Sequence, residues 1–379
     1  MRWRRIKRSM RRREFVVSAL MPALGFGAGK KFARVFFFDK DNVNGGFTDF
    51  AMITPQRGVA LGTYADTKRG GDVRGMMVAT NDGGKTWQET QLKFEPASMF
   101  ALDSMLWAVS LDQDLWFSAE GGRDWNKISK AKNILRVHFL DAQIGFAVGA
   151  RKTALRTEDG GRKWKPIPEA AKASGAIETA AFTWISASRG RFVSLFGNTQ
   201  TFRRPRRGYR QPDWVDPSGA RLDAERPSLT IALDSSDKGV TFKPAQVSAF
   251  GHVHRVRVAP DGQGLIVMKF DRFFDYGGEL YQFKANSESP IERILRPKEM
   301  AIQDAIWVPG DGAYVAMTRR FNNAQLPVPT PVEIWHSRDL KTFEPIPVDY
   351  RAEARVVYLS EVEGQIFAAT SEGMILKLM

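Results

Sequence analysis

The stretch Thr80–Trp87 reads TNDGGKTW, a tight turn that ends on an aromatic residue. Glycine permits the positive φ of such a turn, aspartate accepts hydrogen bonds from turn amides, and a large ring stabilises the turn by burial. The same spacing recurs with changed letters at Ser118–Trp125, Thr157–Trp164 and Ser235–Phe242, and a shortened copy, SRDLKTF, occupies Ser337–Phe343. The first three copies begin at 80, 118 and 157, a period of 38 to 39 residues that is typical of a four-stranded propeller blade.

Strand patterns around these copies predict the rest of the fold. Alternating apolar runs precede the third copy, so that four strands fit into about 35 residues. The same pattern predicts blades at 47–92, 94–130, 133–168, 177–247, 250–295, 300–348 and 353–379. The last blade has only three strands, and the apolar stretch 32–39 supplies the fourth, which removes free sheet edges. We therefore predict an all-β fold, a single β-propeller domain over 32–379 with seven four-stranded blades; six or eight blades are the alternatives.

The residues of the repeated turns are interpreted as structural, because each residue type serves the local geometry rather than a reaction. The residues assigned to this role are Thr80, Asp82, Gly84, Trp87, Glu120, Gly122, Trp125, Asp159, Gly161, Trp164, Asp237, Gly239, Phe242, Asp339 and Phe343. We expect none of them to take part in catalysis.

These turns resemble the Asp-box, or BNR repeat, which lies between the third and fourth strands of a blade. The segment Ile144–Ile167, IGFAVGARKTALRTEDGGRKWKPI, is similar to the repeats of photosystem II stability/assembly factor-like proteins, which are WD40/YVTN/BNR-like propellers. The similarity extends over the first three blades and weakens beyond Gln200, where the turns degrade and insertions enter. The resemblance implies a propeller with a binding or assembly role, and a photosynthetic function does not follow from it.

The N-terminus has the layout of a secretory signal peptide over residues 1–28, with a basic start, an apolar run and small residues. Within it, RREFV at 12–16 resembles a twin-arginine (Tat) export signal, although Arg11 stands where serine or threonine is usual. The apolar run is too short for a bilayer core, which needs about 20 residues. We expect cleavage between Gly25 and Ala33 and a periplasmic or otherwise extracytoplasmic location. An uncleaved anchor and a basic cytoplasmic tail are the alternatives.

Removal of the leader halves the formal net charge of the chain. The whole chain has a formal net charge of +14, and its first 28 residues hold seven Arg, one Lys and one Glu, so the remainder keeps +7. This moderate excess favours contact with anionic surfaces over a dedicated nucleic-acid function. The chain has no cysteine and four scattered histidines, which are the usual ligands of zinc and copper, so we expect no metal and no cofactor.

Four long connections are expected between second and third strands, at 64–74, 198–227, 271–277 and 319–331. In a propeller these connections emerge on one face, opposite the repeated turns, and loops on a rigid scaffold commonly carry recognition. The candidate binding residues there are Arg203, Arg204, Arg206, Arg207, Tyr209, Arg210, Asp271, Arg272, Phe273, Arg319 and Arg320. Arginine forks beside aromatic rings suit a carboxylate, a phosphate or an acidic protein segment, and a solvated basic loop is the alternative.

We expect an exported, non-catalytic, assembly-factor-like monomer near the membrane surface that engages an envelope protein or complex through its long-loop face. An Asp-box glycoside hydrolase, sialidase-like or related, is the alternative function. A sialidase needs an arginine triad, a Tyr–Glu pair and an acidic Asp, and its early Arg-Ile-Pro signature is missing after the leader. For a hydrolase with two facing carboxylates, Asp49, Asp304 and Glu279 are the candidates. His252 and His254 alternate in a predicted strand and are interpreted as packed or solvent-facing.

Overall fold

The computed structural model describes residues 29–68, 70–173, 177–178, 180–188, 192–200, 228–248, 252–269, 277–284, 291–319 and 328–379. Residues Lys31–Met379 form one compact unit. The expected signal peptide at 1–28 lies outside the described residues. Among the residues that are described, no helix has the length and apolar character needed to cross a membrane.

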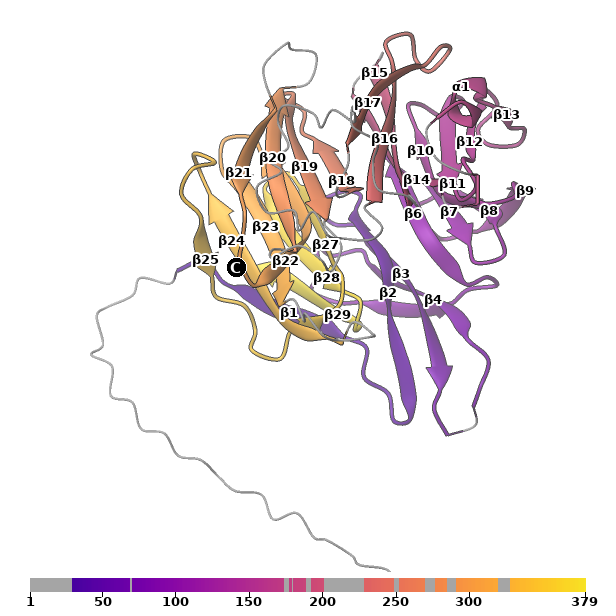
Figure 1. Ribbon diagram of the computed structural model, residues 1–379. Helices are drawn as coiled ribbons and strands as arrows, with labels where there is room; N and C mark the ends of the chain where they lie inside the picture. Colours follow the sequence, from indigo (N-terminus) through magenta and orange to yellow (C-terminus); the bar gives the residue numbers. More distant parts are fainter. Residues whose placement is uncertain are drawn as a thin grey trace, which may run out of the picture. The chain divides into compact units, whose positions relative to one another are not determined.

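Seven antiparallel sheets follow one another along the chain and are arranged in a ring (Figure 1). The first three sheets contain, in chain order, β2 (Val43–Met52), β3 (Gly58–Asp66), β4 (Arg74–Thr80) and β5 (Gln88–Gln91); β6 (Pro96–Leu102), β7 (Met105–Ser110), β8 (Asp114–Ser118) and β9 (Asn126–Lys130); and β10 (Ile134–Phe139), β11 (Gly145–Gly149), β12 (Ala154–Thr157) and β13 (Lys165–Pro166). The next three contain β14 (Ala180–Ser188), β15 (Phe192–Gln200), β16 (Ser228–Ser235) and β17 (Lys243–Ser248); β18 (His252–Val258), β19 (Gln263–Lys269), β20 (Gly278–Lys284) and β21 (Glu292–Leu295); and β22 (Met300–Val308), β23 (Gly312–Arg319), β24 (Thr330–Ser337) and β25 (Glu344–Ile346). The seventh contains β27 (Val357–Val362), β28 (Gln365–Thr370), β29 (Met374–Leu378) and β1 (Phe32–Phe37).

The predicted fold class is confirmed: the chain is a β-propeller with seven four-stranded blades. One short helix, α1 (Pro168–Ala171), connects the third and fourth sheets. A two-residue strand, β26 (Glu353–Ala354), pairs with Thr330 and Pro331 of β24. The first two residues of the range expected for the last blade, 353–379, therefore extend the sixth sheet rather than the seventh.

Burial along each sheet follows from the ring arrangement. The second and third strands have neighbouring sheets on both faces, so they read as nearly continuous apolar runs; β28, QIFAAT, is buried at five of its six positions. The outer strands face solvent, and β5, QETQ, is exposed throughout. Large rings fill the space between sheets, as where Trp107 stacks on Phe139 with ring centroids 4.0 Å apart. The core is therefore divided into layers between consecutive blades.

The ring closes through the N-terminal strand. β1 pairs antiparallel with β29, from Phe32 opposite Leu378 to Phe37 opposite Met374, so the outer strand of the seventh sheet comes from the start of the chain. The amide of Phe32 also donates to the carbonyl of Pro347, at 2.8 Å, in the connection that follows the sixth sheet. Closure of this kind leaves no sheet in the ring without its fourth strand.

The repeated turns join third to fourth strands, and their own side chains hold them. In the first turn the Thr80 hydroxyl accepts from the Gly84 amide at 2.9 Å and donates to the Asp82 carboxylate at 2.8 Å. The hydroxyl and the amide of Thr86 donate to Asp82, and these bonds lower the pKa of Asp82 to about 2. Gly84 has φ of 85°, a region that glycine occupies without strain.

Three of the four later copies keep the hydroxyl-to-carboxylate bond, although the shortened fifth copy has no glycine. The hydroxyl-to-carboxylate bond recurs between Thr157 and Asp159, Ser235 and Asp237, and Ser337 and Asp339. In the second copy Ser118 still accepts from the Gly122 amide, but Glu120 instead pairs with Arg123 at 3.7 Å. The aromatic residues that end the turns pack into the layers between sheets: Trp87, Trp125, Trp164, Phe242 and Phe343.

Glycine carbonyls of these turns accept hydrogen bonds from the preceding sheet. Arg57 of the first sheet donates to Gly121, and Trp107 of the second donates to Gly160 at 3.2 Å. Lys377 of the seventh sheet donates to Gly83 of the first at 2.9 Å. The turns thus link consecutive blades, including the pair where the ring closes.

The inner strands contain breaks in register. β2, β6, β10, β14, β18, β22 and β27 contact one another in ring order and surround the axis. In the first six of these strands the break comes directly before one residue: Asp49, Ser98, Arg136, Trp184, Arg255 or Asp304. A bulge inserts an extra residue and redirects the side chain that follows it. Six residues, four of them charged, are therefore placed at equivalent positions around the axis.

Candidate functional site

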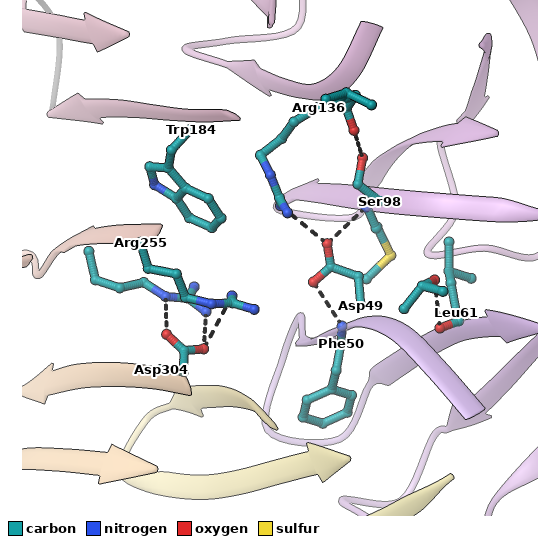
Figure 2. A network of polar contacts seen from close by, with 12 residues as sticks. Asp49, Phe50, Leu61, Ser98, Arg136, Trp184, Arg255 and Asp304 are labelled. Atoms are coloured by element: carbon teal, nitrogen blue, oxygen red, sulfur yellow. Dashed lines mark hydrogen bonds and ion pairs between the residues drawn. The ribbon is translucent and has the colours of Figure 1, made fainter. Parts of the chain in front are cut away.

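Charged side chains gather at the axis of the ring (Figure 2). The five charged side chains come from inner strands of four different sheets, and four of them directly follow the register breaks; Trp184 comes from a fifth sheet. We call this set the axial cluster: Asp49, Arg136, Trp184, Arg255, Arg257 and Asp304.

Asp304 is the most enclosed member of the axial cluster, with no exposed surface. Its carboxylate accepts from Arg257 at 2.8 and 3.3 Å, lies 3.3 Å from Arg255, and accepts from the amides of Ala305 and Leu359, both at 3.0 Å. Burial alone would raise the pKa of Asp304, but the two arginines lower it, so the carboxylate stays ionised. Because Leu359 belongs to β27, Asp304 also joins the sixth sheet to the seventh.

Asp49 makes the equivalent contacts between the first and second sheets. It accepts from the amide of Phe50 and, at 3.0 Å, from the amide of Met99 in β6. Its ion pair is longer, with Arg136 at 3.5 Å. Two aspartates at equivalent positions therefore each fasten one sheet to the next.

Trp184 lies between two arginines. Its ring centroid is 4.3 Å from the guanidinium of Arg136 and 5.3 Å from that of Arg255, and its indole donates to the carbonyl of Val256 at 3.0 Å. Burial lowers the pKa of Arg136. The negative charge of Asp49 opposes this effect, and the positive charge of Arg255 adds to it. Arg255 is only 3% exposed, and its Nε has no hydrogen-bond partner among the described residues.

A cavity of about 260 Å³ adjoins the axial cluster. Its lining runs from the register breaks towards the C-terminal ends of the inner strands, so it lies on the side of the repeated turns and away from the long connections. Three arginines against two aspartates leave an excess of one positive charge, which suits an anionic group. His138 also lines the cavity, and burial, with a smaller effect of Arg136, lowers the pKa of His138 to about 4. Its imidazole is therefore neutral at pH 7.

The hydrolase alternative requires a carboxyl group that can hold a proton near neutral pH. The pKa of Asp304 is shifted in the opposite direction. Glu279 is fully buried and paired with Arg293 at 3.2 Å, and Asp49 is paired with Arg136. All three candidate carboxylates are thus engaged by arginine. Among the described residues, no group of three or more His, Asp and Glu side chains is arranged to hold a metal ion.

A second recess of about 700 Å³ lies where the ring closes. We call it the closure groove, and its lining includes Phe37, Asp39, Tyr64, Val73, Pro329, Arg351, Glu353, Arg355 and Glu372. Tyr64 and Val73 belong to the connection expected at 64–74, and Pro329 belongs to the one expected at 319–331. The groove is therefore on the long-loop face, opposite the repeated turns.

The arginines of the closure groove are paired within the chain. Arg351 donates to both oxygens of Asp349, at 2.9 and 2.7 Å, and Arg355 donates to Glu372 at 2.9 Å. The bonds from Arg351 lower the pKa of Asp349 to about 2.

Ten of the eleven binding residues expected from the sequence lie outside the described residues: Arg203, Arg204, Arg206, Arg207, Tyr209, Arg210, Asp271, Arg272, Phe273 and Arg320. Arg319 is the exposed last residue of β23 and does not line the closure groove. Its amide donates to the hydroxyl of Thr330 at 2.9 Å. The sequence analysis missed the axial arginines. Their only signal was an arginine at one position of an alternating strand pattern, as in ILRVHF.

Solved structures share this fold. A structure described as YCF48 bound to D1 peptide matches with a TM-score of 0.57 and 14% identity, over 94% of this chain and 96% of that one. YCF48 from Cyanidioschyzon merolae matches with a TM-score of 0.57 and 15% identity, over 92% and 98%. The chain has the same fold as YCF48. A chain in a crystal structure of the mitotic checkpoint complex matches with a TM-score of 0.54 and 10% identity, over 97% and 98%.

These matches support the resemblance seen in the sequence at the level of fold. YCF48 is a photosystem II assembly factor, so the propeller expected from that resemblance is confirmed. No protein-family model matches the chain, and no curated protein matches it. With identities of 10 to 15%, these neighbours show the architecture alone.

Proposed function

We propose that this protein is an exported, non-catalytic propeller that binds a protein partner in the cell envelope through its long-loop face. The observation that carries the proposal is the closure groove, a recess of about 700 Å³ bordered by two of the long connections on a rigid ring. Loops on a rigid scaffold commonly carry recognition, and recesses of roughly 300 to 1,000 Å³ are typical of binding sites.

The structural neighbours support a protein as the partner. One YCF48 structure has a D1 peptide bound, and another neighbour is part of the mitotic checkpoint complex. The arginines at 203–210 remain the candidates for an acidic segment of the partner. In the sequence they fall between β15 and β16.

Export rests on the leader at 1–28 with its paired arginines. A protein released by this route would meet its partner in the periplasm or at the membrane surface. Replacement of Arg12 and Arg13 by lysine should retain the full-length chain in the cytoplasm, as measured by cell fractionation. Unchanged export of this variant would remove the twin-arginine route from the proposal.

Site-specific photocross-linking tests the face. A photoreactive phenylalanine analogue at Val73 lies in the closure groove, and the same analogue at Val240 lies in a repeated turn on the opposite face. Position 240 is a matched control for position 73, because Val73 is 50% exposed and Val240 is 67% exposed. We expect an envelope protein to be cross-linked from position 73 and not from position 240.

Two results would overturn the proposed face. Cross-linking from position 240 alone would move the interface to the repeated turns, and no adduct from either position would contradict an envelope partner. A variant with serine at 203, 204, 206, 207 and 210 should lower the yield from position 73 if the arginine loop contributes to binding. If that yield is unchanged, the loop has no part in recognition.

A further inference from the structure

The charged residues that line the closure groove differ in whether they form an ion pair within the chain. Both lining arginines, Arg351 and Arg355, are held by carboxylates of this chain. Lys40, which is next to the groove in sequence, pairs with Glu89. By contrast, Asp39 and Glu353 are exposed lining residues, and neither has an ion pair among the described residues. On a chain with net charge +14, this recess is therefore a local site of unsatisfied negative charge.

The groove also collects exposed apolar surface. Phe37 is 38% exposed and Val73 is 50% exposed, and both line the groove. Val328 and Tyr350, 48% and 88% exposed, are the chain neighbours of lining residues Pro329 and Arg351. Apolar side chains grouped at one recess on a soluble surface mark interaction sites more often than single exposed ones do.

Part of the groove wall is bare backbone. Gly46 lines the groove in β2, and a Cβ at this position would overlap the carbonyl oxygen of Ser371. The chain therefore approaches its neighbour at Ser371 as closely as glycine permits.

We infer that the closure groove binds an extended segment of a protein partner in which basic side chains alternate with apolar ones. The inference rests on the proposed function and adds the chemistry of the partner at this face. A lysine or arginine of the segment would pair with Asp39 or Glu353, and apolar side chains would cover Phe37 and Val73. Alternation is expected because successive side chains of an extended segment point to opposite sides.

A second copy of this chain is the less favoured occupant. Without its leader the chain still carries +7, so two copies repel each other, whereas a basic segment needs only the local negative charge of the groove. Charge complementarity at the groove thus selects a small basic segment over a second propeller.

Fluorescence anisotropy with a synthetic peptide tests the inference on the mature chain. The probe is a labelled peptide in which lysine and leucine alternate, and its control has glutamate in place of lysine. The test variant is Asp39→Asn with Glu353→Gln, which keeps shape and removes both charges. The matched control is Asp112→Asn with Glu299→Gln, two exposed carboxylates that do not line the groove.

We expect the lysine peptide to bind and the glutamate peptide not to bind at this groove. Binding of the lysine peptide should weaken about fivefold in the groove variant, the effect of two exposed ion pairs, and stay unchanged in the control variant. Val73→Ser should also weaken binding through the loss of apolar contact. Equal affinity of all variants, or no binding by the unmodified chain, would overturn the inference.

Two further measurements separate this inference from the proposed function. If Asp39→Asn with Glu353→Gln still cross-links the envelope protein from position 73 at full yield, the face is right and the basic segment is wrong. Sedimentation of the unmodified chain shows a second copy directly: a dimer that dissociates in the Val73→Ser variant would assign the groove to self-association and overturn the inference.

Discussion

The axial cluster and the closure groove both combine carboxylates with arginines, but they differ in how far the charges are satisfied. At the axis, Asp304 is fully buried and contacts two arginines and two amides. In the groove, Asp39 and Glu353 are exposed and have no ion-pair partner in the part of the chain that the structure describes. The first arrangement holds sheets together, and the second leaves charge available to another molecule.

The difference follows from what burial costs. An ionised carboxylate removed from water must be compensated by partners, so a buried aspartate persists only where the fold supplies them. A solvated carboxylate has no such requirement, and its pairing contributes little to stability. Substitutions at the two sites should therefore separate stability from binding.

The largest effect is expected at Asp304. Asp304→Asn removes the charge that Arg255 and Arg257 both contact and leaves two guanidinium groups close together in a buried site. We expect the free energy of unfolding to fall by about 3 kcal/mol, as is usual when one partner of a buried pair is removed. Denaturant titration measures this. Asp49→Asn, with one longer ion pair, should cost less; a larger loss at Asp49 would contradict the comparison.

The loss at Asp304 should depend on pH. Its folded pKa is lowered by the arginines, so its contribution is present above the unfolded value, about 3.9, and is lost as the pH falls through the folded value. The difference between the unmodified chain and Asp304→Asn should therefore be constant from pH 6 to pH 5 and shrink below about pH 4. A difference that grows on acidification would rule out this electrostatic account.

A smaller loss is expected at the glycine in the groove wall. Gly46→Ala places a Cβ against the carbonyl oxygen of Ser371, which is backbone and cannot move aside cheaply. We expect a loss of about 2 kcal/mol in the free energy of unfolding. Gly71→Ala is the matched control, because its Cβ would lie 3.3 Å from the Cβ of Asp66. Similar losses in both variants would mean that close packing at Gly46 does not decide the result.

The sequence predicted the ring better than it predicted the sites. The turn spacing and the alternating strands depend on local chemistry, and the apolar stretch at 32–39 is observed as β1 beside β29. The axial cluster depends on breaks in strand register, and an alternating pattern of apolar and polar residues does not reveal them. A bulge before Arg136 or Arg255 changes where the side chain points. The closure groove joins Phe37, Val73 and Arg351, which only ring closure brings together.

A modest effect is expected where the ring closes. Lys377→Met keeps an unbranched side chain near Phe367 and removes two hydrogen bonds, to the carbonyl of Gly83 and to the side-chain oxygen of Gln365. Gln365 is partly exposed and can bond to water instead, so we expect the free energy of unfolding to fall by about 1 kcal/mol, the usual net value of the one bond to Gly83. Thermal unfolding should show a small shift with unchanged cooperativity. A loss as large as that of Asp304→Asn would mean that closure, and not the axis, is the critical junction.

The smallest effect on stability is expected from the groove variant Asp39→Asn with Glu353→Gln. Both side chains are exposed and neither has an ion-pair partner among the described residues, so the free energy of unfolding should change by less than about 0.5 kcal/mol. Denaturant titration and the peptide-binding assay together separate stability from binding, because the same two substitutions should weaken peptide binding and leave the free energy of unfolding nearly unchanged. If they instead destabilise the fold by more than 1 kcal/mol, roughly the upper value for an exposed pair, these carboxylates have a structural role like that of the axial aspartates.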